Sequence, residues 1–219
     1  MSGPVGPVEP PVPLLVVCTG NICRSPAAEL LLRAGLGEDA GIAVASAGLA
    51  ARAGEPVAAP MARLLAERGV QPAGFVARQL QPPVLRSAGV VLTMTTAQRS
   101  AVVTRAPSAV RRAFTLHEFA ELASLAGELP GQVRPVDRLV ALIAAAPRLR
   151  ALRTGPRDDD VEDPYRRSDE VFGRVLARID ADVAALLAFL TAAPAGTAQP
   201  SSETSAGCGH GTTRVAPVG

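Results

Sequence analysis

Apolar residues along the chain fall into short unbroken runs separated by longer stretches with helical spacing. The short runs predict strands at residues 14–17, 42–47, 89–94 and 113–116. Strands that alternate with helices are typical of a parallel sheet covered on both faces. The pattern therefore predicts an α/β fold, a three-layer sandwich with a central four-stranded parallel sheet and helices on both faces.

The strongest helical signal begins at Asp169, where apolar side chains recur every four residues as far as Leu187. Ser168 suits the N-cap of this helix. The same spacing, together with helix-stopping residues, predicts the other helical segments, at residues 25–36, 57–69, 82–87, 96–105, 117–125 and 136–146. In the first of them Ser25 suits the N-cap, and Pro26 suits the first helical position.

Both ends of the chain differ in composition from the middle. Residues 1–13 are rich in proline and glycine, and residues 194–219 in proline, serine, threonine and glycine. Segments of this kind bury too little apolar surface to fold and are typically disordered. We therefore expect one domain over residues 14–193, between a disordered lead and a disordered tail.

A strand, a tight loop and a helix follow one another at residues 14–36 and bring two reactive side chains together. Cys18 begins the loop and Arg24 ends it, with five residues between them. Loop amides in front of a helix N-terminus form an anion site. A helix N-terminus and a guanidinium both favour the thiolate form of a cysteine, which is its nucleophilic form. A thiolate at the floor of an anion site suggests attack on a phosphoryl group.

The string Cys-Thr-Gly-Asn-Ile-Cys-Arg-Ser-Pro at residues 18–26 resembles the low molecular weight protein-tyrosine phosphatases, in which this motif follows the first strand directly. The resemblance implies hydrolysis of protein phosphotyrosine through a phosphocysteine intermediate, without a metal or other cofactor. It implies that Cys18 is the nucleophile and that Arg24 clamps the phosphate. The implied phosphate-binding residues are Thr19, Gly20, Asn21, Ile22, Cys23, Arg24 and Ser25.

Attack on a phosphate ester also needs an acid that protonates the leaving oxygen. The candidates lie in the acidic segment 158–165, which could also be a solvated loop. Asp163 is the preferred residue because the following proline fixes the local backbone and an aromatic residue comes next. The resemblance also implies that Asp163 acts first as the general acid and then as the general base. Asp160 remains the alternative.

The resemblance also implies further roles around the loop. Tyr165 and Ile22 would line the substrate pocket, although Tyr165 could simply pack at a loop edge. Asn21, Ser25 and Ser46 would hold the shape of the loop, and Ser25 would also stabilise the thiolate. Two departures stand out: no aromatic residue follows Gly48 at residues 49–51, and Phe75 replaces a frequent histidine. His117 is expected on the surface of its helix.

The chain has three cysteines, Cys18, Cys23 and Cys208, which form neither a disulfide scaffold nor a zinc-site spacing. The resemblance implies that Cys23 traps the oxidised nucleophile as a reversible disulfide, which would make the protein redox-sensitive. The alternative is that Cys23 contributes only its backbone amide to the loop.

Three other functions stay open at this point. Protein-arginine phosphatases of this fold tend to have threonine where this chain has Ile22, so isoleucine favours phosphotyrosine. Arsenate reductases of the fold relay electrons through additional cysteines, and here only Cys208 remains. A phosphocysteine carrier or a catalytically silent phosphate-binding module would lack turnover altogether.

Composition and charge narrow the classes further. All 22 basic residues are arginine, which excludes a Schiff-base lysine and a nucleotide-binding phosphate loop. A formal net charge of +2 does not indicate nucleic acid as a partner. The apolar stretches are too short to span a bilayer. We therefore expect a soluble, cytoplasmic protein whose partner is a phosphotyrosine-containing protein, with a tyrosine kinase as one candidate. The sequence leaves the oligomeric state open.

Overall fold

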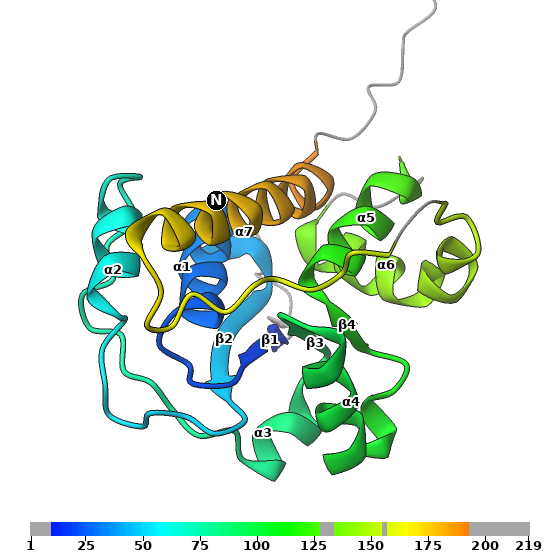
Figure 1. The fold of residues 1–219 in the computed structure, drawn as a ribbon. Coiled ribbons are helices and arrows are strands. Elements are labelled where there is room, and N and C mark those ends of the chain that lie inside the picture. Colours follow the sequence, from blue (N-terminus) through cyan, green and yellow to red (C-terminus); the bar gives the residue numbers. More distant parts are fainter. Residues whose placement is uncertain (1–9, 128–133, 155–156, 193–219) are drawn as a thin grey trace, which may run out of the picture.

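A four-stranded parallel sheet forms the centre of the molecule (Figure 1). The computed structural model describes residues 10–127, 134–154 and 157–192, so the disorder expected for most of the lead and for the tail concerns residues outside these ranges. The strands are arranged in the order β2-β1-β3-β4. Their bounds are Val12–Cys18 (β1), Ile42–Gly48 (β2), Val90–Thr93 (β3) and Ala113–Thr115 (β4). The predicted fold class is confirmed.

Parallel pairing brings the carboxyl ends of the strands to one edge of the sheet. Cys18 at the end of β1 lies opposite Gly48 at the end of β2, and Val17 lies opposite Thr93 at the end of β3. Ligands of open parallel sheets bind outside this edge. The sequence motif that begins at Cys18 therefore lies where a ligand site is expected.

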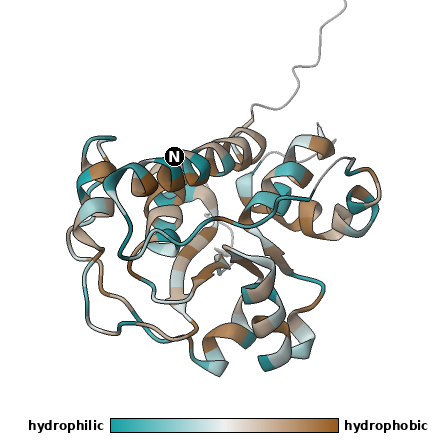
Figure 2. Ribbon diagram, in the orientation of Figure 1, coloured by the Kyte–Doolittle hydropathy of each residue, from teal (hydrophilic) through white to brown (hydrophobic). Residues whose placement is uncertain are grey.

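Helices cover both faces of the sheet, and each face has its own apolar core. Leu14 and Val16 of β1 face one core, and Leu15 and Val17 face the other, because successive side chains of a strand alternate. Figure 2 shows the hydrophobic residues concentrated on the strands between the helical layers. The first core is covered by α1 (Arg24–Leu36), α2 (Ala59–Ala66), α5 (Leu116–Ala126), α6 (Pro135–Arg150) and α7 (Asp169–Leu190), and the second by α3 (Pro82–Ser87) and α4 (Thr96–Arg105).

The long helix α7 holds the first of these layers together. Its apolar face, which includes Val175 and Ile179, packs against α1 and α5. The recurrence of apolar residues every four positions predicted this face correctly. Ser168 is the N-cap residue as expected, but its side chain makes no capping hydrogen bond to the backbone.

Three elements differ from the sequence-based predictions by more than one residue at an end. Strand β1 begins at Val12, so its first two residues belong to the sheet and not to a disordered lead. Helix α2 is shorter than the predicted segment 57–69. Helix α6 continues past Pro147, where the prediction had stopped, and ends at Arg150. Burial of Leu149 and a hydrogen bond of 2.7 Å from Arg150 Nε to Glu118 Oε1 favour this last turn despite the missing proline N–H.

None of the helices in the described ranges is both long enough and apolar enough to cross a membrane.

Candidate active site

Residues 19–23 form a loop between the end of β1 and the start of α1. Several carbonyl groups of this loop accept hydrogen bonds from the stretch that follows β2. The donors of these hydrogen bonds are backbone N–H groups within residues 49–58. Leu49 N donates to Cys18 O (2.9 Å), Ala50 N to Thr19 O (3.0 Å) and Arg52 N to Gly20 O (2.9 Å). Gly48 permits this approach, since a Cβ there would lie 2.6 Å from Thr19 O. These hydrogen bonds hold the loop through its carbonyl groups and use none of its backbone N–H groups.

Asn21 gives the loop its tight turn and connects it to the neighbouring strand. Its backbone has φ 55°, in the left-handed region that asparagine tolerates better than most residues. Its side-chain nitrogen donates to Ser25 Oγ at 2.9 Å and to Ser46 Oγ at 2.8 Å. All three side chains are buried. The structure therefore brings together the three residues that the sequence assigned to the shape of the loop.

The Cys18 sulfur lies at the floor of the pocket and has two polar neighbours. It is 3.0 Å from Ser25 Oγ, and the backbone N–H of Asn21 donates to it at 3.2 Å. The predicted role of Ser25 as N-cap is wrong, because Cys23 occupies that position and Ser25 lies inside the first turn of α1. Its hydroxyl is directed to the sulfur and not to the end of the helix.

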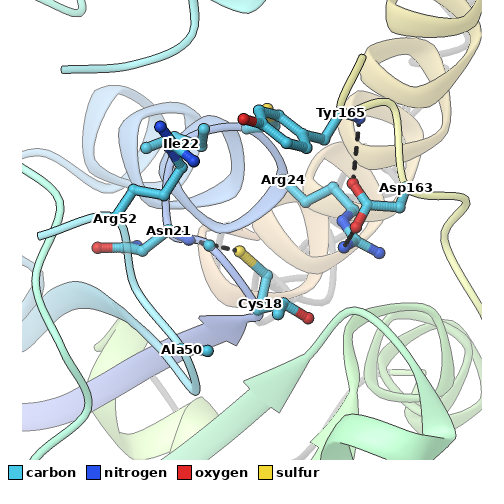
Figure 3. Close-up of a pocket in the computed structure, with 11 residues that line it drawn as sticks. Cys18, Asn21, Ile22, Arg24, Ala50, Arg52, Asp163 and Tyr165 are labelled. Carbon is cyan, nitrogen blue, oxygen red and sulfur yellow. Dashed lines mark hydrogen bonds and ion pairs between the residues drawn. The ribbon is translucent and has the colours of Figure 1, made fainter. Parts of the chain in front are cut away.

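Arg24 connects the loop to the acidic segment 139 residues further along the chain. Its NH2 group donates to Asp163 Oδ2 at 2.5 Å, and its NH1 group donates to Val161 O at 3.0 Å. Figure 3 shows the Asp163 carboxylate beside Arg24 at the mouth of the pocket, with Cys18 below. The arginine itself is buried, whereas the Asp163 side chain is 52% exposed. Nucleophile, guanidinium and carboxylate thus line one pocket.

Contacts of residues 159–161, in addition to those with Arg24, fasten the acidic segment and distinguish its two candidate acids. Val161 N donates to Met94 O at 2.8 Å. Asp160 Oδ1 accepts from Thr96 N at 2.7 Å, so this carboxylate serves as an anchor and does not line the pocket. Asp159 is the third anchor and pairs with Arg153 at 2.5 Å. The geometry favours Asp163 over Asp160 as the acid.

The anchor at Asp159 is electrostatic and largely buried. Burial raises the pKa of this carboxyl, but the hydrogen bond and charge of Arg153 outweigh burial, so the pKa of Asp159 lies below its usual range. The same hydrogen bonds raise the pKa of Arg153. Both groups therefore stay charged near neutrality, and the ion pair holds the segment that carries Asp163.

The walls of the pocket contain one aromatic ring and one unexpected residue. Ile22 and Tyr165 both line the pocket, together with Ala50 and Arg52. The guanidinium carbon of Arg52 lies 5.5 Å from the centre of the Tyr165 ring. In Figure 3 the Arg52 side chain points toward that ring across the mouth. The pocket has a volume of about 210 Å³. Residues 49–51 supply no aromatic side chain to its wall, and the guanidinium of Arg52, the next residue, borders it instead.

Cys23 is a buried free thiol that also lines the pocket. Burial, followed by the charges of Cys18 and Asp163, raises the pKa of Cys23 to about 12, with Arg24 acting in the opposite direction. The Cys23 thiol is therefore protonated at neutral pH and does not compete with Cys18 as a nucleophile. Cys208 lies outside the described residues.

Two residues that contact the side chains of Ser46 and Asn21 were not predicted from the sequence. Glu29 accepts a hydrogen bond of 2.6 Å from Ser46 Oγ, and Arg78 N donates to Asn21 Oδ1 at 2.8 Å. The signal for Glu29 was its place on the first helix, four residues after Ser25 and so on the same face. No sequence signal marked Arg78, which donates from its backbone N–H to Asn21 and from Nε to Ser46 O at 2.7 Å.

The expectation that His117 lies on the surface of its helix is wrong. It is half-buried, and its Nδ1 is 2.7 Å from Asp182 Oδ1 of α7. Burial raises the pKa of Asp182, and the hydrogen bond from His117 opposes this. Ligand atoms of His117, Glu121 and Asp159 lie within 4.8 Å of one another, a spacing compatible with a metal ion. Arg153 already donates to both carboxylates, so we interpret the group as an ion network that joins helices.

The fold and the site together define an α/β protein with a cysteine nucleophile in a phosphate-binding loop. A family model described as low molecular weight phosphotyrosine protein phosphatase matches residues 13–130, and the chain belongs to this family.

Relatives and solved structures agree with this assignment. "Probable low molecular weight protein-tyrosine-phosphatase EpsP" from Ralstonia nicotianae is 34% identical over 144 residues, which are 64% of this chain and 97% of the relative. A protein-arginine-phosphatase from Geobacillus stearothermophilus is 37% identical over 109 residues, 50% of this chain and 72% of the relative. The structure of the YwlE arginine phosphatase from the same organism superposes with a TM-score of 0.60 at 26% identity and covers 81% of this chain and 91% of its own.

Proposed function

We propose that this protein hydrolyses phosphotyrosine in proteins through a phosphocysteine intermediate. The observation that carries the proposal is the convergence of Cys18, Arg24 and Asp163 on one pocket at the carboxyl edge of the sheet. We also infer that the catalytic unit corresponds to the domain expected over residues 14–193, extended by the start of β1 at Val12.

In the first step the Cys18 thiolate attacks phosphorus, the S–P bond forms and the P–O bond to the phenol breaks. The planar fork of Arg24 and the N–H groups of residues 19–24 stabilise the charge on the phosphoryl oxygens in the transition state. The carboxylic acid form of Asp163 gives its proton to the departing phenolate. No metal is needed, since the charge of the phosphoryl group is met by protein donors.

In the second step the Asp163 carboxylate takes a proton from a water molecule, and the oxygen of that water attacks phosphorus. The S–P bond breaks and Cys18 leaves as a thiolate. Ser25 and the N–H of Asn21 support this step, because both lie within hydrogen-bond distance of the sulfur that must carry the returning charge.

The substrate class follows from the shape of the pocket. The phenyl ring of phosphotyrosine would lie between Ile22 and Tyr165, with the phosphate on the loop. The guanidinium of Arg52, which lies 5.5 Å from the Tyr165 ring, would border the mouth of the pocket beside the substrate ring. The partner is then a phosphotyrosine-containing protein, with a tyrosine kinase as one candidate and the reducing cytoplasm as the expected compartment.

The direct test is turnover of p-nitrophenyl phosphate and of a phosphotyrosine peptide, with reductant and a metal chelator present. We expect both to be hydrolysed, and rapid acid quenching to trap phosphate on the peptide that contains Cys18. A protein that binds phosphate but hydrolyses neither compound would be a silent binding module.

Hydrolysis of phosphoarginine is the second candidate, because a protein-arginine-phosphatase is among the relatives, at 37% identity. The bulky Ile22 in the pocket wall favours phosphotyrosine over phosphoarginine. Comparing kcat/KM for the two peptides of otherwise identical sequence decides between them. A higher value for phosphoarginine would reverse the assignment.

We further propose that Cys23 protects the nucleophile from overoxidation. Peroxide would oxidise the Cys18 thiolate to a sulfenic acid, and Cys23 would attack that sulfur, release water and form a disulfide that a thiol reductant reopens. Loss of the negative charge on Cys18 removes one of the causes that raise the pKa of Cys23. Dithiothreitol should restore peroxide-treated wild type but not Cys23→Ser, and equal recovery of both would rule out this role.

A further inference from the structure

The guanidinium of Arg166 lies beside the mouth of the pocket and has no carboxylate partner among the described residues. Its Cζ lies 5.3 Å from the centre of the Tyr165 ring, which lines the pocket. Arg166 is exposed and is not itself one of the lining residues. Its charge therefore faces the part of a substrate that stays outside the pocket, which is the sequence next to the phosphorylated residue.

The carboxylates that lie close to Arg166 in the chain are already paired with other arginines. Asp163 accepts from Arg24 at 2.5 Å. Glu162 lies 3.7 Å from the guanidinium groups of two other arginines, and Asp169 accepts from a further one at 2.9 Å. Arg166 is thus left with an uncompensated positive charge beside the site.

A tight turn holds Arg166 in this place. Arg167 N donates to Pro164 O at 2.9 Å, which closes a turn with Tyr165 and Arg166 as its two central residues. The φ angle of Arg166 is 59°, a left-handed conformation that glycine or asparagine adopts with less strain. A side chain that is kept on such a backbone beside a pocket indicates a function for that side chain.

Arg52 gives the mouth of the pocket a second guanidinium, but this one has a carboxylate partner. Its Cζ lies 5.5 Å from the centre of the same Tyr165 ring. Its Nε donates to Glu55 Oε2 at 2.7 Å. Arg52 should therefore attract an acidic group less strongly than Arg166, because such a group has to compete with Glu55.

We propose that Arg166 binds an acidic side chain of the substrate protein, one or two residues away from the phosphotyrosine, and that Arg52 assists it. With the phosphate on the loop and the phenyl ring beside Tyr165, the substrate backbone leaves the pocket at its mouth. Residues of an extended chain advance by about 3.3 Å each, so the neighbouring side chains come within reach of a guanidinium there. The preferred substrate is thus a phosphotyrosine flanked by Asp or Glu. The proposal rests on the proposed function and narrows its substrate class.

The test uses three phosphotyrosine peptides that differ only at the two positions on each side of the phosphotyrosine, which hold Glu, Gln or Lys. The measured quantity is kcat/KM for the Glu peptide divided by kcat/KM for the Gln peptide, so a general loss of activity in a variant cancels. For the wild type we expect a ratio of about three to ten at low salt, as for a few exposed ion pairs. The ratio should approach one at high salt, and the Lys peptide should be the poorest substrate.

Arg166→Asn removes the charge but keeps a residue that tolerates the left-handed backbone, so its ratio should fall toward one. Arg166→Lys should keep most of the preference. Arg111→Asn is the matched control, because it removes the same charge from an exposed arginine before β4, at the opposite edge of the sheet, and should leave the ratio unchanged. Glu55→Gln removes the charge that neutralises Arg52 and should raise the ratio by about twofold.

A wild-type ratio near one at low salt, or a wild-type ratio retained by Arg166→Asn, would overturn the proposal. A wild type that hydrolyses none of the peptides would instead contradict the proposed function. The role of Arg166 is then decided by binding, from the Kd of Cys18→Ser for the same peptides, with and without Arg166→Asn, measured by calorimetry. If Cys18→Ser binds the Glu peptide no more tightly than the Gln peptide, Arg166 does not select acidic substrates.

Discussion

The loop of residues 18–24 and the segment of residues 158–165 supply the two halves of the site, and they are built in opposite ways. Cys18 and residues 21–24 of the loop are buried, and hydrogen bonds connect the loop to β2 and to the stretch that follows β2. The acidic segment carries a half-exposed Asp163 and is held by the buried side chain of Val161 and by polar contacts with Arg24, Thr96 and Arg153. The nucleophile thus lies among buried, hydrogen-bonded side chains, whereas the side chain of the acid is half exposed.

This contrast suits the demands of the two groups. A thiolate and its oxyanion donors must be fixed before the reaction, since their alignment determines the stabilisation of the transition state. A general acid must reach a leaving group that differs in size from one substrate to another. Four substitutions test the contrast, and they are described from the largest expected effect to the smallest.

Cys18→Ser should abolish the loop's chemistry while preserving its structure. We expect kcat for p-nitrophenyl phosphate to fall by more than about 10⁴-fold, because a serine hydroxyl is a far weaker nucleophile than a thiolate. Phosphate binding, measured by calorimetry, should survive because the loop amides and Arg24 remain. Residual turnover within tenfold of the wild type would mean that Cys18 is not the nucleophile.

Asp163→Asn should remove the acid and leave the nucleophile intact. We expect kcat/KM for phenyl phosphate, which reports the first step alone, to fall by about 10²- to 10³-fold, within the range typical of general acid catalysis. The loss should be much smaller for 2,4-dinitrophenyl phosphate, whose leaving group needs no proton. Asp160→Asn is the matched control, and a larger loss in that variant would exchange the roles of the two residues.

Arg153→Met should loosen the acidic segment without touching the pocket. Removing one partner of a buried ion pair leaves Asp159 unpaired, and we expect the free energy of unfolding to fall by about 3 kcal/mol. The kcat/KM for phenyl phosphate should drop more than that for 2,4-dinitrophenyl phosphate, because the acid is less well placed for the first step. Equal losses with both substrates would show that the ion pair acts on stability alone.

The same variant gives a pH test whose sign follows from Asp159. In the folded wild type the pKa of this carboxyl is lowered, since Arg153 outweighs burial. Its contribution to stability is therefore present above its ordinary pKa of about 3.9 and is lost as the pH falls through the lower folded value. The difference in unfolding free energy between wild type and Arg153→Met should narrow from pH 5 to pH 3. A constant difference would contradict the ion pair as its source.

Tyr165→Ala should have the smallest effect, because in the proposed mechanism the ring would contact the substrate but no reacting atom. We expect KM for a phosphotyrosine peptide to rise by about threefold to tenfold, as for the loss of one aromatic contact, with kcat nearly unchanged. Arg52→Ala should act in the same direction. A fall in kcat that exceeds the rise in KM would mean that the ring also positions Asp163.

The sequence predicted the fold well where local pattern determines structure. The strands, the helix from Asp169 and the loop at Cys18 each consist of consecutive residues whose spacing is visible in the chain. The α6 helix shows the limit, since its last turn beyond Pro147 depends on burial of Leu149 and on a bond from Arg150 to another helix. Such tertiary contacts leave no trace in local spacing.

The same limit applies to the site. Cys18 and Arg24 could be named because the motif contains both, and Asp163 because a proline and an aromatic residue follow it. The cap assigned to Ser25 was wrong because its hydroxyl is directed to a sulfur seven residues earlier. Glu29 and Arg153 act through partners on other elements, and Arg52 through its place beside a ring that lies 113 residues further along the chain.

The approach of residues 48–52 to the phosphate loop has one more consequence. Those residues continue the hydrogen bonding between β2 and β1 beyond the end of β1. The phosphate loop, which forms the anion cradle, is therefore attached directly to the sheet and shares its rigidity. Little conformational entropy remains to be lost when a phosphoryl group arrives, so binding energy is not consumed in ordering the receptor. The cradle should keep its shape for as long as the sheet itself persists, and its collapse should coincide with global unfolding.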